Sequence, residues 1–151
     1  MFDVDDFTLE NMMERMKHFQ ASHENNCRLV AVVAGGGGHF LSSLSSTPGA
    51  SSILLEGTIT YGRESFKGYV KKDLDDDFKY SSVEAATLVA APALAQALRL
   101  SSGKGVFSMD NAVHCVGLGC SSSLLSNSTR EGRRSRAFIT VCFPDSRRSE
   151  M

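Results

Sequence analysis

The sequence has few of the features that mark small secreted, membrane-spanning or nucleic-acid-binding proteins. It has no tryptophan, only three prolines, and a net charge of −1 from 16 basic and 17 acidic side chains, which excludes a generally basic nucleic-acid binder. No apolar run approaches the ~18 residues that a membrane span needs. The cysteines are scattered and complete no paired metal motif, so we expect buried thiols, no metal site and no cofactor. They are Cys27, Cys115, Cys120 and Cys142.

The chain does have the composition of one ordinary globular domain. It contains 151 residues, of which 42% are hydrophobic and 22% charged. A chain of this size buries roughly two-thirds of its unfolded surface and needs no disulfide or metal to fold. We predict a single domain over 1–151, with its core at about 8–143 and a polar tail at 145–151. The first residues lack the basic and apolar blocks of a secretory signal, so we expect a cytoplasmic protein.

The first third of the chain predicts a helix, a strand and a second helix. Apolar residues at helical spacing indicate an amphipathic helix over about 8–20. The stretch 28–33 (RLVAVV) is typical of a strand buried on both faces of a parallel sheet. Four glycines at 35–38 lead into a short helix that ends at the 47–49 break. The apolar residues of the first helix are Leu9, Met12, Met13, Met16 and Phe19.

The rest of the chain continues the alternation of strands and helices. Ser81 and Glu84 form a capping box for the longest helix, which Pro92 either kinks or divides in two. The aspartate-rich stretch 71–79 lacks the ligand pattern of a calcium loop and is expected to be a solvated loop. This order of elements predicts a three-layer α/β/α sandwich. The expected elements are a strand at 53–61, a helix at 64–70, a long helix at 81–100, and strands at 112–116 and 137–143.

Two glycine-rich segments, 35–38 and 117–119, each follow an expected strand. In an open α/β sheet the carboxyl ends of the strands form the ligand crevice, and the amides at a helix N-terminus suit a phosphate. Neither segment is a P-loop, because His39 follows Gly38 where lysine is required, and neither completes the G-x-G-x-x-G fingerprint. An anion site and a flexible tight turn both remain open.

Several polar residues near expected strand ends are candidates for contact with a ligand. His39 directly follows the first glycine run. Tyr61 ends a strand, and Arg63 and Lys67 come shortly after it, so a positive polar cluster at the strand end is expected. Arg133 and Arg134 belong to a basic run, and arginine is suited to bidentate phosphate contacts. Each of these side chains has an ordinary alternative as a solvated surface residue.

Four segments in this order resemble the C-terminal domain family of CinA. The stretch 37–51 is similar to the family's glycine turn, helix and PGAS corner, with Pro48-Gly49-Ala50-Ser51 as the corner. The stretch 56–61 (EGTITY) resembles its "GGVVxYSN" strand, and 82–86 (SVEAA) resembles its "VSEEVA" helix start. The stretch 116–119 (VGLG) stands where the family has "TGIAGP". The resemblance spans about residues 8–143.

This resemblance implies a fold and an activity. The family is similar to nicotinamide-nucleotide amidases, which convert nicotinamide mononucleotide (NMN) and water to nicotinic acid mononucleotide and ammonia. It implies a three-layer α/β/α sandwich with a mixed, mostly parallel sheet, and a homo-oligomer. The family's nucleophile is the serine of "AESCTGG", helped by the tyrosine of "YSN" and by a lysine five residues after that tyrosine.

The chain departs from the family at the catalytic positions. Ala34 stands at the nucleophile position, and a methyl group cannot attack an amide. Tyr61 matches the tyrosine, but Phe66 stands at the lysine position, with Lys67 one residue later. We therefore predict a domain that binds a phosphate-bearing nucleotide with weak or no catalysis, in which only Tyr61 and Lys67 are left as catalytic candidates. The predicted ligand contacts are Gly35, Gly36, Gly37, Gly38, His39, Gly117, Gly119, Arg133 and Arg134.

Two other functions remain open from the sequence. One is an amidase with a non-standard nucleophile, in which Ser42, Ser45 or Ser46 supplies the hydroxyl and Lys67 is the base. The other is a non-catalytic interaction protein that kept the fold and assembles with copies of itself. The partners expected in the main hypothesis are a small-molecule phosphate or nucleotide and a second copy of the chain, not nucleic acid or a membrane.

Overall fold

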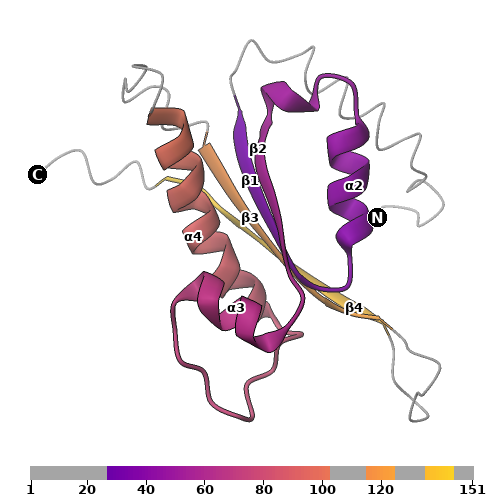
Figure 1. The fold of residues 1–151 in the computed structure, drawn as a ribbon, viewed down its shortest axis with the longest axis vertical. Helices are drawn as coiled ribbons and strands as arrows, with labels where there is room; N and C mark the ends of the chain where they lie inside the picture. The colour runs from indigo at the N-terminus through magenta and orange to yellow at the C-terminus, as the bar shows by residue number, and fades with distance from the viewer. Residues whose placement is uncertain (1–26, 103–114, 125–134, 145–151) are drawn as a thin grey trace, which may run out of the picture.

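The computed structural model describes residues 27–102, 115–124 and 135–144. The predicted helix at 8–20 lies outside these residues. The described part is an open sheet with helices on both faces (Figure 1). Its elements in chain order are β1 (Arg28–Gly35), α2 (Gly38–Ser46), the 3₁₀ turn η2 (Ala50–Ser52), β2 (Leu54–Thr60), α3 (Arg63–Val70), α4 (Val83–Ser102), β3 (Cys115–Ser123) and β4 (Arg136–Cys142).

The sheet has four strands in the order β2-β1-β3-β4. β1 pairs in parallel with both β2 and β3, and β4 pairs antiparallel with β3. β1 is therefore central, and its residues Val30, Ala31, Val32 and Val33 are fully buried, as its unbroken apolar run predicts. The sheet is mixed and mostly parallel, which confirms the predicted fold class.

The two faces of the sheet carry different helices. α3 and α4 cover one face, and α2 lies on the other (Figure 1). Because successive side chains of a strand point to opposite faces, β1 contributes to two separate core clusters. Val30, Val32 and Ala34 pack on the α3–α4 side, whereas Ala31 and Val33 pack on the α2 side.

Helix α4 rests directly on the backbone of β3. A Cβ atom on Gly117 would lie 2.3 Å from the backbone nitrogen of Leu94, and one on Gly119 would lie 2.0 Å from the carbonyl oxygen of Ala86. The prediction that these glycines form a turn after a strand is wrong, because both lie inside β3. The sequence pattern indicated a turn, but at these positions the missing side chain makes room for a helix.

The start and the middle of α4 also refine the sequence predictions. The backbone N–H of Ala85 donates to Ser82 Oγ at 3.0 Å, so Ser82 caps the helix in place of Ser81. Pro92 lies inside α4, which continues past it as a single helix. By length and composition alone, the stretch Val83–Ser101 is apolar enough to span a membrane, contrary to the sequence estimate. In this fold, one side of that stretch lies against the sheet.

The aspartate-rich loop is exposed as predicted, whereas the expectation of buried thiols holds for only two of the four cysteines, since Cys27 and Cys142 are half-buried. The aspartates of 71–79 are exposed, and the described residues contain no group of three or more His, Cys, Asp or Glu side chains that could hold a metal ion. All four cysteines are free, with Cys115 and Cys120 buried. Burial raises the pKa of the Cys27 and Cys120 thiols, which makes both poor nucleophiles at neutral pH.

Candidate functional site: a cavity at the carboxyl ends of the parallel strands

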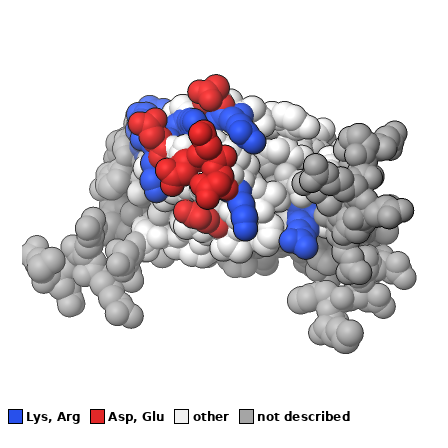
Figure 2. All heavy atoms as spheres, turned by 90° about the horizontal axis from the view of Figure 1, so that it is seen from below, with Lys and Arg blue, Asp and Glu red and all other residues white. Residues whose placement is uncertain are grey.

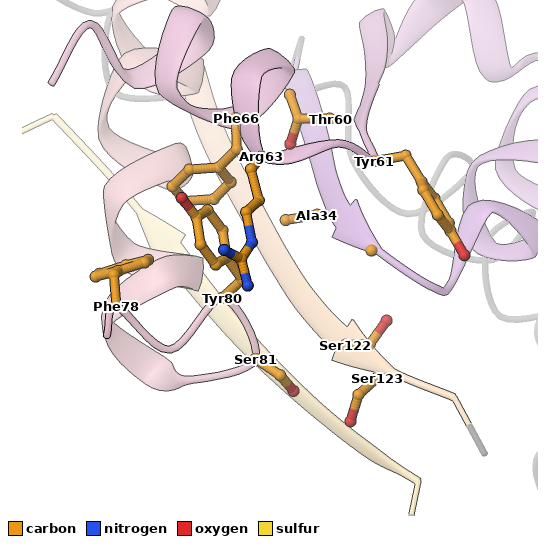
Figure 3. A pocket seen from close by; sticks show the side chains of 11 residues that line it. Ala34, Thr60, Tyr61, Arg63, Phe66, Phe78, Tyr80, Ser81, Ser122 and Ser123 are labelled. Atoms are coloured by element: carbon orange, nitrogen blue, oxygen red, sulfur yellow. The ribbon is translucent and has the colours of Figure 1, made fainter. Parts of the chain in front are cut away.

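A cavity of about 380 Å³ opens where β1, β2 and β3 end, on the sheet face that carries α3 and α4 (Figure 3). This is the crevice in which open α/β sheets bind ligands, and its volume suits a small molecule. The lining residues come from the three strand ends, from α3 and from the segment before α4. They are Ala34, Gly35, Thr60, Tyr61, Arg63, Phe66, Phe78, Tyr80, Ser81, Ser122 and Ser123.

Ala34 and Phe66 line this cavity together. These are the two positions that the family resemblance equates with the nucleophile and the lysine. Ala34 is 3% exposed and Phe66 is 1% exposed. At these two positions the chain presents a methyl group and a phenyl ring, where the resemblance implies a hydroxyl and an amine for covalent chemistry.

Three aromatic rings form one wall of the cavity. The centroid of the Phe66 ring lies 5.2 Å from that of Tyr80 and 6.0 Å from that of Phe78, and the Phe78 and Tyr80 rings meet edge to face at 5.0 Å. Arg63 extends over the Tyr80 ring, with its guanidinium carbon 5.5 Å from the ring centroid (Figure 3). This cation–π contact orients the guanidinium at the cavity.

Arg63 is also the first residue of α3. The N-cap residue Gly62 provides no side-chain cap, and its carbonyl accepts from the N–H of Phe66 at 2.9 Å. The N–H groups of a first helical turn have no partner within the helix, and the helix dipole favours negative charge there. The start of α3 therefore combines a guanidinium with uncapped amides beside the cavity.

Two hydroxyls at the cavity are buried and have no hydrogen-bond partner within the described part of the chain: Thr60 Oγ1 and Ser81 Oγ. Thr60 is 2% exposed, and Figure 3 shows its hydroxyl directed toward Ala34. A buried polar atom without a partner is uncommon and costly in a native protein. The two hydroxyls are therefore positions where a bound molecule would gain hydrogen bonds.

Two neighbouring serines of β3, Ser121 and Ser122, already form hydrogen bonds within the protein. Ser121 Oγ donates to the carbonyl oxygen of Tyr80 and accepts from the N–H of Ser82. Ser122 Oγ donates to the carbonyl oxygen of Gly36. These bonds tie the end of β3 to the aromatic wall on one side and to the glycine turn on the other, so they shape the cavity.

The glycine turn packs tightly against β3. Gly35 and Gly37 have φ angles of +79° and +94°, which side chains disfavour. A Cβ on Gly35 would lie 2.3 Å from the carbonyl oxygen of Ser122, and that oxygen accepts from the N–H of Gly36 at 3.3 Å. The Gly36 amide is thus already bonded. Of the predicted 35–38 cradle, only Gly35 lines the cavity.

The structure separates the other predicted ligand contacts from the cavity. Gly117 and Gly119 lie beneath α4, and the exposed His39 is in the first turn of α2. Arg133 and Arg134 lie outside the described residues. The predicted phosphate cradle is therefore not assembled at this cavity by the described residues that were expected to form it.

The two catalytic candidates do not meet in the cavity either. Tyr61 lies at its rim with 76% of its surface exposed, and Figure 3 shows its ring directed away from the aromatic wall. Lys67 is half-buried in the last turn of α3 and is not among the lining residues.

The serines proposed as substitute nucleophiles lie elsewhere in the fold. Ser45 and Ser46 both donate their hydroxyl to the carbonyl oxygen of Ser42, at 3.1 and 2.7 Å. All three are exposed on α2, whereas Lys67 belongs to α3 on the other side of the sheet (Figure 1). The described structure therefore does not bring this nucleophile and base together.

Sequence reasoning missed Thr60, Tyr80 and Ser81 as cavity residues. Thr60 alternates normally within its strand, and Ser81 was taken for a helix cap, so neither stood out. The available signal was that a second serine, Ser82, competes with Ser81 for the capping position. Tyr80 follows a charged stretch and carries no motif of its own.

The surface around this end of the molecule carries both signs of charge. Viewed from below, acidic side chains gather in one cluster with basic side chains beside them (Figure 2). The stretch 71–79 exposes four aspartates and three lysines. Because basic side chains lie beside the acidic cluster, the net long-range field is weak, and the exposed Arg63 at the cavity has the larger effect on an anionic ligand.

Solved structures of known proteins share the fold of this chain. A CinA superfamily protein from Escherichia coli matches with a TM-score of 0.62 and 13% identity, over 96% of this chain and 81% of that chain. One from Enterobacter cloacae matches with a TM-score of 0.59 and 11% identity, over 96% and 83%. The competence damage-inducible protein A from Klebsiella pneumoniae matches with a TM-score of 0.50 and 12% identity, over 90% and 76%.

The fold is similar to that of these CinA superfamily structures. The sequence matches no protein-family model and none of the curated proteins compared with it. The likeness is therefore one of structure, at identities that establish the fold alone.

The side chains that line the cavity differ in kind from those that activate a nucleophile. Among the described residues that line it there is no histidine, lysine or carboxylate. No lining side chain can therefore take a proton from the hydroxyl of Thr60 or Ser81 in the way that an activated nucleophile requires. The groups that remain are one guanidinium, aromatic rings and hydroxyls.

Proposed function

We propose that this protein is a CinA-fold domain that binds a small phosphate-bearing nucleotide in the strand-end cavity and does not hydrolyse it. The observation that carries the proposal is the pairing of Ala34 at the nucleophile position with two buried, unpartnered hydroxyls in one cavity beside Arg63. Ala34 cannot act as a nucleophile, whereas the two hydroxyls and Arg63 can form hydrogen bonds to a ligand.

Each part of a nucleotide has a matching group. Arg63 and the uncapped first turn of α3 suit the phosphate, because a guanidinium forms bidentate bonds to phosphate oxygens and helix amides favour an anion. Thr60 and Ser81 suit ribose hydroxyls or an amide. The aromatic wall offers apolar contact for a planar ring. The cavity volume of about 380 Å³ is sufficient for a mononucleotide.

Titration calorimetry with NMN and related mononucleotides tests the proposal. We expect binding by the parent chain, and a rise in Kd of at least about tenfold in Arg63→Gln, because a hydrogen bond to a charged group contributes about 1.5–3 kcal/mol. Arg99→Gln is the matched control, since Arg99 is exposed in the last turn of α4 and does not line the cavity. Absence of heat up to millimolar nucleotide would reject the proposal.

Thr60→Val gives a second test in which stability and binding change in opposite directions. The substitution removes a buried hydroxyl that has no partner, so the free protein should become more stable by about 1 kcal/mol. The same change should weaken nucleotide binding, because the ligand loses a hydrogen bond. Urea unfolding and calorimetry measure the two effects. Greater stability with unchanged affinity would show that the nucleotide does not reach Thr60.

The amidase alternative is tested by ammonia release from NMN. We expect none from the parent chain, because the cavity lacks both nucleophile and base. Turnover by the unmodified chain would contradict a binding-only function. Ala34→Ser/Phe66→Lys, which restores both family side chains, serves to check that the assay and the bound geometry can report activity.

A further inference from the structure

A second cavity, of about 460 Å³, lies on the same face of the sheet as the strand-end cavity but at the other end of α3. It is formed by the end of α3, the second half of α4 and the edge strand β2. The described residues that line it all differ from those that line the strand-end cavity. Three of them carry charge: Glu56 from β2, Lys71 directly after α3, and Arg99 from α4.

An irregularity in the strand pairing directs Glu56 toward this cavity. Leu29 of β1 pairs with Leu54 of β2. The next residue of β1, Val30, pairs with Glu56, so β2 holds one extra residue, Leu55. In a regular strand Leu55 and Glu56 would point to opposite faces. Here both meet the α3–α4 side, since Leu55 packs against that core cluster and Glu56 bonds to α4. Bulges that redirect a side chain in this way are over-represented beside active sites.

The Glu56 carboxylate is half-buried, and the groups that donate to it in the described part of the chain are neutral. Its Oε2 accepts from Gln96 Nε2 at 2.7 Å, and its Oε1 accepts from Thr58 Oγ1 at 3.2 Å. Burial and this nearby carboxylate both raise the pKa of Tyr69, so the phenol beside Glu56 stays protonated at neutral pH. Each carboxylate oxygen can accept a further hydrogen bond, and a charged donor forms the strongest one. Glu56 is therefore a place for a cation.

A guanidinium lies on the far side of the same amide group. Arg99 Nε donates to Gln96 Oε1 at 2.9 Å, so Gln96 stands between Glu56 and Arg99 and holds the two charges apart. The terminal N–H groups of Arg99 take no part in this bond. Arg99 is exposed, and the exposed Lys71 adds a second positive charge to the lining. This side of the cavity suits a carboxylate, which a guanidinium binds through two parallel hydrogen bonds.

We propose that this second cavity binds the zwitterion of a free α-amino acid with an apolar side chain, its ammonium on Glu56 and its carboxylate on Arg99. Such a molecule suits the spacing, because only the α-carbon separates its two charged groups, and a single amide group separates the contacts of Glu56 and Arg99. The apolar part of the lining offers contact for the ligand's side chain. It comes from Val70, Pro92 and Ala95.

A ligand with a single charge would use only half of this arrangement. Arg99 and Lys71 repel a simple amine, and Glu56 repels a simple carboxylate. Three compounds of matched shape make the difference measurable. They are L-leucine, isopentylamine, which lacks the carboxylate of leucine, and isocaproate, which lacks its ammonium.

Titration calorimetry of the full chain with these three compounds tests the proposal. We expect L-leucine to bind with a Kd at least about tenfold lower than that of either single-charge compound, because each of them loses one charged hydrogen bond. Equal or tighter binding of isopentylamine or isocaproate overturns the proposal. No heat from L-leucine up to about 10 mM overturns it as well.

Two substitutions test the residues assigned to the charged ends. Glu56→Gln keeps the size of the side chain and removes its charge, so the Kd of L-leucine should rise at least about tenfold. Glu64→Gln is the matched control, since Glu64 is exposed in the first turn of α3 and does not line this cavity. Arg99→Gln should also raise the Kd at least about tenfold. Its control is Arg136→Gln, at an exposed position of β4.

Urea unfolding shows whether each variant is folded. Unchanged affinity for L-leucine in folded Glu56→Gln or Arg99→Gln overturns the proposal, and so does an equal loss in either control variant. The Arg99→Gln chain also serves as the control at the strand-end cavity, where it should bind nucleotide as the parent does. The two sites are therefore tested independently, and failure of one leaves the other standing.

Discussion

The two glycine-rich segments of this protein look alike in the sequence and do different work in the fold. At 35–37 the backbone turns through positive φ angles at the end of β1 and closes against Ser122. At 117–119 it runs straight through β3 beneath α4. The first segment needs glycine for its conformation as well as its contacts. The second needs it only because a helix backbone occupies the space of a side chain.

This difference shows why glycine content alone does not identify a phosphate site. In α/β folds a glycine after a strand is often explained by a phosphate. Here both segments have neighbours within the protein that account for them, and the groups best placed to hold a ligand lie on α3 and β2. When individual glycines are replaced by alanine, the loss in the free energy of unfolding should be larger where the neighbouring atoms are more rigid.

The largest effect is expected from Gly119→Ala. Its Cβ would lie 2.0 Å from the carbonyl oxygen of Ala86 and 2.8 Å from the nitrogen of Ala90, both backbone atoms of α4. The whole helix must move, so we expect a loss of about 3 kcal/mol in the free energy of urea unfolding. Gly68→Ala on α3, where a Cβ meets no atom within 4 Å, is the control and should not destabilise the protein. A loss under about 1 kcal/mol would show that α4 does not rest on β3.

An intermediate effect is expected from Gly35→Ala. The residue has φ +79° and a Cβ would lie 2.3 Å from the Ser122 carbonyl oxygen. The left-handed conformation costs about 1–2 kcal/mol for a residue with a side chain. Because the turn can shift away from β3, we expect a total loss of about 2 kcal/mol, together with weaker nucleotide binding, since Gly35 lines the cavity. Unfolding and calorimetry measure both quantities. Unchanged affinity for the nucleotide in this variant would show that the turn at Gly35 does not contribute to binding.

The smallest effect is expected from Gly38→Ala, and its sign should be reversed. Gly38 is the first residue of α2, and a Cβ would lie 3.2 Å from the end of the flexible Ile59 side chain. Alanine restricts the unfolded chain at little cost to the folded one, so we expect a gain of about 0.5 kcal/mol in urea unfolding. A loss comparable to that of Gly35→Ala would mean that the whole 35–38 run is conformationally constrained.

Much of the fold was predictable because its signals are local. The apolar run of β1, the alternation in β2, the Pro48-Gly49 break after α2 and the alanine-rich α4 each determine an element within a few residues. β3 was misplaced because Gly117 and Gly119 are turn signals locally, and only the packing of α4, distant in sequence, makes them strand residues.

The candidate site was predictable only in part. The family resemblance led to Ala34 and Phe66, and both line one cavity. The groups proposed to bind a ligand were only partly predictable, because Arg63 follows Tyr61 in the sequence but its contacts, and those of Thr60, depend on the three-dimensional structure. Thr60 is notable only because its hydroxyl is buried without a partner. Arg63 is notable because Tyr80 lies beneath its guanidinium. Neither fact is contained in the spacing of residues.

The parallel pairing of β1 with β3 also has a consequence for folding of the chain during its synthesis on the ribosome. Arg28 pairs with Cys115, 87 positions later. At a synthesis rate of about 5–20 residues per second, the first strand waits roughly 4–17 seconds for its neighbour to be made. During that time the largely apolar strand β1 has one unpaired edge, so we expect chaperones to bind the nascent chain. Slowing translation between the two segments should lower the soluble yield.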